Sequence, residues 1–258
     1  MNFSKLPPEK KFFDLSLWPA PLAFLFVKVF HRTGLRPEWF VLLSFCFGVL
    51  LALAIVNEAS KGWILLFLFF RAFFDVVDGM WARATKTVTP LGGLLDLSGD
   101  ILSNTLLFAA LGLNLSKTIG PMAALGLTCA AWLICHFTMT TYSFNFFLYQ
   151  TEGKIPPSRF VEGDFQSVRI LPLIFLYRMT WRVLALGVLR LRGPLGFLSL
   201  FGLCSHLLYL TVCVLFWVPE GFVFVELALG LIFVLFLAGR TLKKSRPRIE
   251  GSGPSSNL

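Results

Sequence analysis

The 258-residue chain is 56% hydrophobic and only 14% charged, which is too apolar for a soluble domain that must cover itself with polar groups. It is predicted to be an all-α integral membrane protein. The formal charge of +9 does not indicate a nucleic-acid partner, because the basic residues are spread along loop segments beside apolar stretches. An anionic membrane face explains this distribution better.

The N-terminal segment, residues 1–36, is predicted to lie on the cytoplasmic side of the membrane. Within it, Leu15 to Arg32 is an apolar stretch that carries Lys28, His31 and Arg32 at i, i+3 and i+4. This spacing places the three basic side chains in one polar stripe on a helix. We therefore expect an amphipathic helix in the interface of the cytoplasmic leaflet.

Six later runs have the length, about 17 to 25 residues, that a helix needs to cross a bilayer. They lie within residues 37–240, and residues 241–258 have the composition of a basic, disordered cytoplasmic tail. The six predicted spans are Pro37 to Val56, Trp63 to Trp81, Gly92 to Leu113, Pro121 to Thr140, Leu195 to Val218 and Phe222 to Ala238.

A further apolar segment, Val168 to Arg192, is interrupted by five arginines. A seventh span would bury these guanidinium groups and place the basic tail outside, so an interfacial or partly inserted helix is the preferred interpretation. Arg178 and Arg182 lie at i and i+4 in this segment. They can reach lipid phosphates, or they can line a pocket for a phosphate-bearing substrate.

The distribution of basic residues predicts the orientation of the six spans. Twenty Lys and Arg residues fall on the side that holds both termini, whereas only Lys61 and Lys117 fall in the opposite loops. By the positive-inside rule, the side with twenty basic residues is cytoplasmic. Both termini are therefore expected in the cytoplasm.

The second predicted span carries an unusual polar face. At about 100° per residue its polar and small residues project to one side of the helix. An ionised carboxylate near hydrocarbon is expensive, so acidic residues here indicate a functional site. The residues on this face are Arg71, Asp75, Asp78, Gly79 and Ala82, with Arg83 at its edge.

The third predicted span repeats the pattern, with Gly92, Asp96 and Asp100 at i, i+4 and i+8. Thr89 and Pro90 form a suitable N-cap and first-turn pair, so this helix is expected to begin there. Two antiparallel helices joined by so short a loop are expected to be neighbours. Their acidic faces can then converge just inside the cytoplasmic boundary.

Four carboxylates at close quarters need a counter-charge, since they would otherwise repel one another. Oxygen ligands without His or Cys favour Mg²⁺, Mn²⁺ or Ca²⁺ over zinc or copper. Paired metal ions beside phosphate can neutralise charge on the attacking and leaving oxygens. Gly79 and Gly92 leave room for a ligand near the backbone, and Arg83 provides a guanidinium fork for phosphate. The pattern therefore predicts phosphoryl transfer.

The spacing Asp-x-x-Asp-Gly-x-x-Ala-Arg, eight residues, Gly-x-x-x-Asp-x-x-x-Asp resembles the signature of the CDP-alcohol phosphatidyltransferases. All eight fixed positions from Asp75 to Asp100 match. One difference lies at the start of the first span. Many relatives have Pro-Asn-x-x-Thr there, where this chain has Pro37 followed by Glu38, with Val41 in the Thr position.

The resemblance implies an enzyme dependent on two Mg²⁺ or Mn²⁺ ions. Its site is expected to open to the cytoplasmic leaflet. It would break a CDP-linked donor, release CMP and join the substituted phosphate to an alcohol. CDP-diacylglycerol is the favoured donor, and transfer from CDP-choline or CDP-ethanolamine to diacylglycerol is the alternative. By the same resemblance, Asp75, Asp78, Asp96 and Asp100 would hold the metals, Asp100 would also be the general base, and Gly79, Ala82, Arg83 and Gly92 would frame CMP.

Several alternatives stay open at this point. A divalent-cation transporter also places acids on membrane helices, and relatives of the resembled family suggest a homodimer. Arg71 is either a charge partner for Asp75 or a phosphate ligand. His136 and His206 are expected to be hydrogen-bonded packing residues, and Glu226 has no assigned partner beyond an interhelical hydrogen bond. The five cysteines are expected to be buried small residues.

Overall fold

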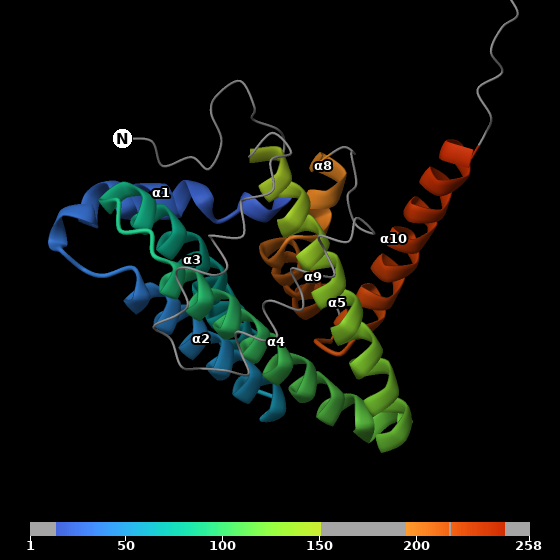
Figure 1. The fold of residues 1–258 in the computed structure, drawn as a ribbon. Coiled ribbons are helices and arrows are strands. Elements are labelled where there is room, and N and C mark those ends of the chain that lie inside the picture. The colour runs from blue at the N-terminus through green and yellow to red at the C-terminus, as the bar shows by residue number, and fades with distance from the viewer. Residues whose placement is uncertain (1–13, 151–194, 217, 246–258) are drawn as a thin grey trace, which may run out of the picture.

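The computed structural model describes residues 14–150, 195–216 and 218–245 (Figure 1). All regular elements within these ranges are helical, which confirms the all-α prediction. Val168 to Arg192, with Arg178 and Arg182, and the tail from 246 onward lie outside the described residues. The helices are α1 (Ala20–Phe30), α2 (Glu38–Val56), α3 (Lys61–Thr85), α4 (Pro90–Ile119), α5 (Pro121–Gln150), α8 (Leu195–Leu198), α9 (Leu203–Phe216) and α10 (Gly221–Ser245), with the 3₁₀ turns η2 (Leu15–Leu17), η3 (His31–Thr33) and η4 (Ser199–Phe201).

Four of the described helices, α2, α4, α5 and α10, are long and apolar enough to cross a membrane. Helix α3 is also 25 residues long, but Arg71, Asp75 and Asp78 interrupt its apolar stretch. Helix α9 is apolar and has 14 residues. Each of these six helices overlaps one of the six predicted runs, and the number that crosses the bilayer stays a prediction.

The fifth predicted span, Leu195 to Val218, is not one continuous helix. It is divided into α8, η4 and α9, and the chain is extended at Gly202 between the last two (φ −76°, ψ 157°). Side chains of α9 bind carbonyl groups on the other side of the break: Ser205 Oγ donates to Ser199 O at 2.6 Å, and Tyr209 Oη donates to Leu200 O at 2.9 Å. Helix α9 alone is about 21 Å long, shorter than a hydrocarbon core of about 30 Å.

Helices α4 and α5 form a long hairpin and extend beyond the predicted spans. Each has 30 residues, which corresponds to about 45 Å. Gly120 ends α4 with φ 86°, a conformation that glycine adopts without strain. Pro121 then begins α5. Both helices are thus longer than a bilayer core requires, and their ends are expected to extend past it.

Helix α2 packs against both α3 and α4 (Figure 1). Side chains of α3 and α4 also meet, as at Arg71 and Asn104. The close approach of α2 and α4 depends on Gly48. A Cβ atom at this position would lie 2.6 Å from Ser103 Cβ. Helix α2 therefore sets the spacing of the two helices that carry the aspartates.

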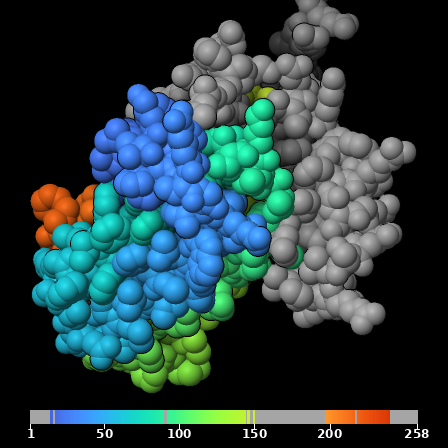
Figure 2. Space-filling model, turned by 90° about the vertical axis from the view of Figure 1, so that its left-hand side faces the viewer, coloured from blue at the N-terminus to red at the C-terminus, as the bar shows by residue number. Residues whose placement is uncertain are grey.

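Helix α1 lies across α3, and α1 and α2 form much of one face of the molecule (Figure 2). An aromatic cluster joins the three helices. Phe26 contacts Phe40, Phe73 and Trp81 with ring centroids 5.6 to 6.3 Å apart. The indole N–H of Trp81 also donates to Leu35 O at 2.8 Å. Lys28 of α1 is exposed, as are several of its apolar side chains, so its place in the interface stays a prediction.

The C-terminal half packs onto this unit through α5 and α9. Helix α5 contacts α4 and α10, and α9 contacts α3 and α10. Gly230 of α10 lies against α5, where a Cβ atom would be 2.8 Å from the Ile134 side chain. The Trp18 indole N–H donates to Cys204 O at 2.9 Å and joins the N-terminal segment to α9.

At the end away from the aspartates, the loop before α3 is joined to α4. Lys117 Nζ lies 2.5 Å from Glu58 Oε1. The hydrogen bond from Lys117 lowers the pKa of Glu58 below its ordinary value. Both side chains are exposed, so this ion pair contributes little to stability.

We expect Gly48→Ala to destabilise the fold by about 1–3 kcal/mol, because the added methyl group overlaps Ser103 and forces α2 and α4 apart. Thermal unfolding of the purified protein in detergent measures this as a lower Tm. Gly126→Ala in α5 is the matched control, because a Cβ atom there meets nothing within 4 Å. Equal Tm values for Gly48→Ala and the wild type would contradict the close packing.

Candidate active site

The candidate site lies near the ends of α3 and α4 that the short 86–89 connection joins. Helix α4 begins as predicted: Thr89 is the N-cap, its Oγ1 accepts from the Gly92 N–H at 3.0 Å, and Pro90 occupies the first turn. Helix α3 ends at Lys86, which adopts the left-handed conformation with φ 58°. This tight connection turns the chain back so that the acidic residues of both helices lie at the same end.

The structure brings together three of the four predicted aspartates. Asp75 of α3 and Asp96 and Asp100 of α4 have carboxylate oxygens that all lie within 4.8 Å of one another. The three side chains are only partly buried. A divalent cation could therefore enter from outside and be bound by oxygen ligands of both helices.

Asp78 lies deeper, with 6% of its surface exposed. It is outside the group of three but close enough to interact electrostatically with Asp75, Asp96 and Asp100. Asp78 and Asp75 are one turn apart on the same face of α3. The acidic group thus consists of three partly buried carboxylates and one that is buried.

Arg83 lies over Gly79. A Cβ atom on Gly79 would be 3.2 Å from Arg83 Nη1, so the missing side chain lets the guanidinium group approach the helix backbone. Arg83 also interacts electrostatically with Asp78. Arg83, the side chain predicted to bind phosphate, therefore lies next to the predicted metal ligands.

The other two predicted CMP-framing residues lie at the helix ends. Gly92 is in the first turn of α4, where a Cβ atom would be 3.0 Å from Thr89 Oγ1. Ala82 is in the last turn of α3, and its carbonyl oxygen accepts from the Lys86 and Thr87 N–H groups. Both residues therefore flank the connection beside the aspartates.

Arg71 is fully buried one turn before Asp75. Its Nη2 donates to Asn104 Oδ1, and its charge acts on Asp100 and Asp75. Within the described part of the chain, its Nε and Nη1 have no hydrogen-bond partner. The contacts favour the interpretation of Arg71 as a counter-charge of the acidic group over a phosphate ligand at the surface.

Two neighbours of the acidic group were not predicted. Asn104 continues the face of Asp96 and Asp100 by one further turn, so extending the i, i+4 pattern would have found it. Cys204 of α9 donates from Sγ to Asp75 Oδ2 at 3.5 Å. No local signal marks Cys204, because only the packing of α9 against α3 brings it there.

The donor atoms fit a hard divalent cation. Carboxylate oxygens are the ligands that Mg²⁺ and Mn²⁺ prefer, and three of them converge from two helices. Among the described residues, four carboxylates lie beside the buried guanidinium of Arg71 and the partly buried one of Arg83, so negative charge is concentrated here. A bound divalent cation would relieve this repulsion.

Comparison with known proteins agrees with this geometry. The family model described as CDP-alcohol phosphatidyltransferase matches residues 35–235, which include all four aspartates. No curated protein and no solved structure matches the chain. The matched range covers well over half of the 258 residues, and the chain therefore belongs to the CDP-alcohol phosphatidyltransferase family of transferases.

Proposed function

We propose that this membrane enzyme transfers a substituted phosphate from CDP-diacylglycerol to an alcohol and releases CMP. The observation that carries the proposal is the meeting of Asp75, Asp96 and Asp100, three residues of the family motif, within 4.8 Å at one end of two helices. Transfer from CDP-choline or CDP-ethanolamine to diacylglycerol is the alternative. The catalytic domain would be residues 37–240, between the cytoplasmic segment 1–36 and the tail 241–258.

The aspartates would hold two Mg²⁺ or Mn²⁺ ions, with Asp78 as the deeper ligand. Such ions, when bound, neutralise charge on the pyrophosphate and on the leaving CMP. Arg83 would bind a donor phosphate as a fork, and its place over Gly79 keeps it beside Asp78. Gly92 and Ala82 would leave room for CMP near the connection of the two helices.

Asp100 is the proposed general base. It lies one turn beyond Asp96 on α4, and the positive charge of Arg71 acts on it. A carboxylate in this place can accept the proton of the acceptor hydroxyl while that oxygen attacks the phosphorus. Arg71 is fully buried and held by Asn104, and its positive charge would favour the ionised form of Asp100.

The proposed reaction requires a divalent cation and a CDP-linked donor. Purified protein is incubated with Mg²⁺ and labelled CDP-diacylglycerol across a panel of alcohols, and separately with CDP-choline or CDP-ethanolamine plus diacylglycerol. We expect CMP release with CDP-diacylglycerol, its loss in EDTA, and its return when Mg²⁺ or Mn²⁺ is added in excess. Turnover that persists in metal-free buffer would refute the metal dependence, and activity only with CDP-choline or CDP-ethanolamine would select the alternative donor.

Substitution of Asp100 and Asp78 should separate the base from a metal ligand. Asp100→Asn keeps the shape of the side chain and removes the basic carboxylate, so the single-turnover rate should fall by about 10²- to 10⁴-fold with donor affinity largely kept. Asp78→Asn removes a ligand and should weaken metal and donor binding together. Donor affinity and single-turnover rate are measured for both variants at saturating Mg²⁺. An Asp100→Asn variant that turns over normally, or that loses donor affinity as severely as Asp78→Asn, would show that Asp100 is not the base.

We also propose that the aspartate end faces the cytoplasm. In a background without the exposed Cys46 and Cys129, a cysteine at Val88 in the 86–89 connection should react with an impermeant maleimide only from the cytoplasmic side. A cysteine at Ser60, at the opposite end of α3, should react only from outside. A cysteine after Arg246 is expected to react from the cytoplasm. Labelling of that tail site from outside would mean that Val168 to Arg192 is a further span.

A further inference from the structure

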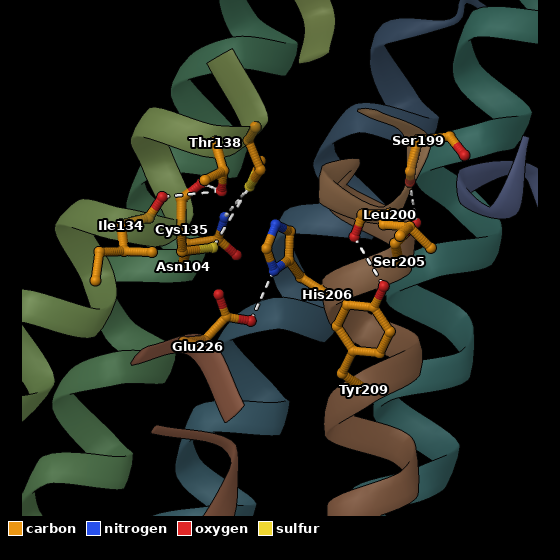
Figure 3. Close-up of polar contacts among 11 residues, drawn as sticks. Asn104, Ile134, Cys135, Thr138, Ser199, Leu200, Ser205, His206, Tyr209 and Glu226 are labelled. Atoms are coloured by element: carbon orange, nitrogen blue, oxygen red, sulfur yellow. Dashed lines mark hydrogen bonds and ion pairs between the residues drawn. The ribbon is translucent and has the colours of Figure 1, made fainter. Parts of the chain in front are cut away.

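A second cluster of polar side chains lies inside the bundle, apart from the aspartates. Cys135 of α5, His206 of α9 and Glu226 of α10 each offer one donor atom, and these atoms lie within 4.8 Å of one another. The three residues are almost completely buried, with 2%, 2% and 0% of their surface exposed. Figure 3 shows the His206 ring between the Glu226 carboxylate on one side and Cys135 on the other.

The hydrogen bonds of this cluster are incomplete. His206 Nδ1 lies 2.6 Å from Glu226 Oε1, and this contact joins α9 to α10. His206 is thus the interhelical partner of Glu226 that could not be assigned from the sequence. Within the described part of the chain, Glu226 Oε2 has no hydrogen-bond partner, and His206 Nε2 makes no hydrogen bond of good geometry although Cys135 is close enough to interact with the ring. Buried polar atoms left without a partner are unfavourable. A ligand bound to this cluster would reduce this penalty.

The three donors differ in kind from the aspartate group. A thiolate, an imidazole and a carboxylate are the ligand set of zinc and similar d-block cations, whereas an all-oxygen group suits Mg²⁺. A Zn²⁺ ion bound by one thiolate, one carboxylate and a neutral imidazole has no net charge, which suits an apolar interior. The thioether Sδ of Met139 lies 3.6 Å from Cys135 Sγ and is the protein donor at hand for a fourth position.

We propose that Cys135, His206 and Glu226 form a zinc-type metal site, separate from the catalytic aspartates. Binding would displace the thiol proton of Cys135 and the proton shared by His206 and Glu226, and both protons would leave to solvent. Three protein ligands come from three helices, so the ion would hold α9 and α10 against α5. The proposed role is structural.

The cluster is also linked to the aspartate site through the packing. Asn104 donates from Nδ2 to Met139 Sδ at 3.7 Å and accepts from Arg71, whose charge acts on Asp100. Helix α9 carries both His206 and, two residues earlier, Cys204, which donates to Asp75. An ion that holds α9 in place would therefore keep this side of the aspartate site in position.

Cobalt is the appropriate probe, because a thiolate bound to Co²⁺ produces a sulfur-to-metal charge-transfer absorption that oxygen ligands do not. The full-length protein is purified in detergent, reduced, stripped with a chelator and titrated with Co²⁺. We expect one equivalent to produce the charge-transfer band and the visible absorption of a tetrahedral ion, and Zn²⁺ to abolish both. Zn²⁺ should also raise the Tm of the stripped wild type.

Variants assign the band to its thiol. Cys135→Ala and Cys135→Ser should lose it, and Zn²⁺ should not raise their Tm. Cys213→Ala removes another buried thiol of α9 outside the cluster and should keep the band. Cys204→Ala removes the thiol beside Asp75 and should keep it as well, which separates this site from cobalt bound at the aspartates.

A folded wild type that binds Co²⁺ without a sulfur band would overturn the proposal, and His206 and Glu226 would then be a plain buried ion pair. Loss of the band in Cys204→Ala, or its survival in Cys135→Ala, would overturn it too. Folding is verified by helical circular dichroism and by elution as a single species in detergent. These readouts do not require turnover, so they stand whether or not the proposed transferase reaction is found.

Discussion

The repulsion among four carboxylates beside a membrane interior is the constraint on which this structure depends. Electrostatic energies are large where water is scarce, so the aspartates of α3 and α4 can be held together only against positive charge. Arg71 and Arg83 supply part of that charge from within the chain. Bound cations would add to it, which is why the proposed mechanism requires a metal at this site.

Much of the packing serves to hold this charge arrangement. Helix α2 contributes no carboxylate to the site, but it separates and aligns the two helices that do. Ser44 of α2 donates to the Arg71 carbonyl at 3.1 Å, and Gly48 leaves space for both Ser103 and the Arg71 side chain. A helix without catalytic residues therefore determines where the buried guanidinium lies, and with it the environment of Asp100.

The parts of the site that follow from local geometry could be predicted from the sequence. The spacing of Asp75 and Asp78, and of Asp96 and Asp100, places each pair on one helix face, and Thr89 identifies the start of α4. The meeting of the acidic faces of α3 and α4 was also predicted, and carboxylates of both helices do lie together. The sequence did not show that α2 packs against both helices.

The contacts between distant segments could not be predicted. The break before α9 was not predicted although Gly202 lies there, because an isolated glycine is also tolerated inside a helix. The contacts of Ser205 and Tyr209 with carbonyl groups across the break exist only in the folded chain. The pairing of His206 with Glu226 and the approach of Cys204 to Asp75 likewise require the packing of α9. Periodicity describes one helix at a time, whereas these contacts join helices far apart in the chain.

The central claim is that aspartates from both helices together bind the divalent cations and that this site also receives the CMP part of the donor. The most direct test is to measure Mn²⁺ binding, which is detected as a loss of the free-ion signal in electron paramagnetic resonance. The account predicts that CDP tightens Mn²⁺ binding to the wild type. It predicts the same for the control variant Glu58→Gln, which removes a carboxylate at the other end of the helices. In Asp96→Asn the binding should be weak and CDP should have little effect. Equal binding by Asp96→Asn and the wild type, with the same response to CDP, would contradict the account.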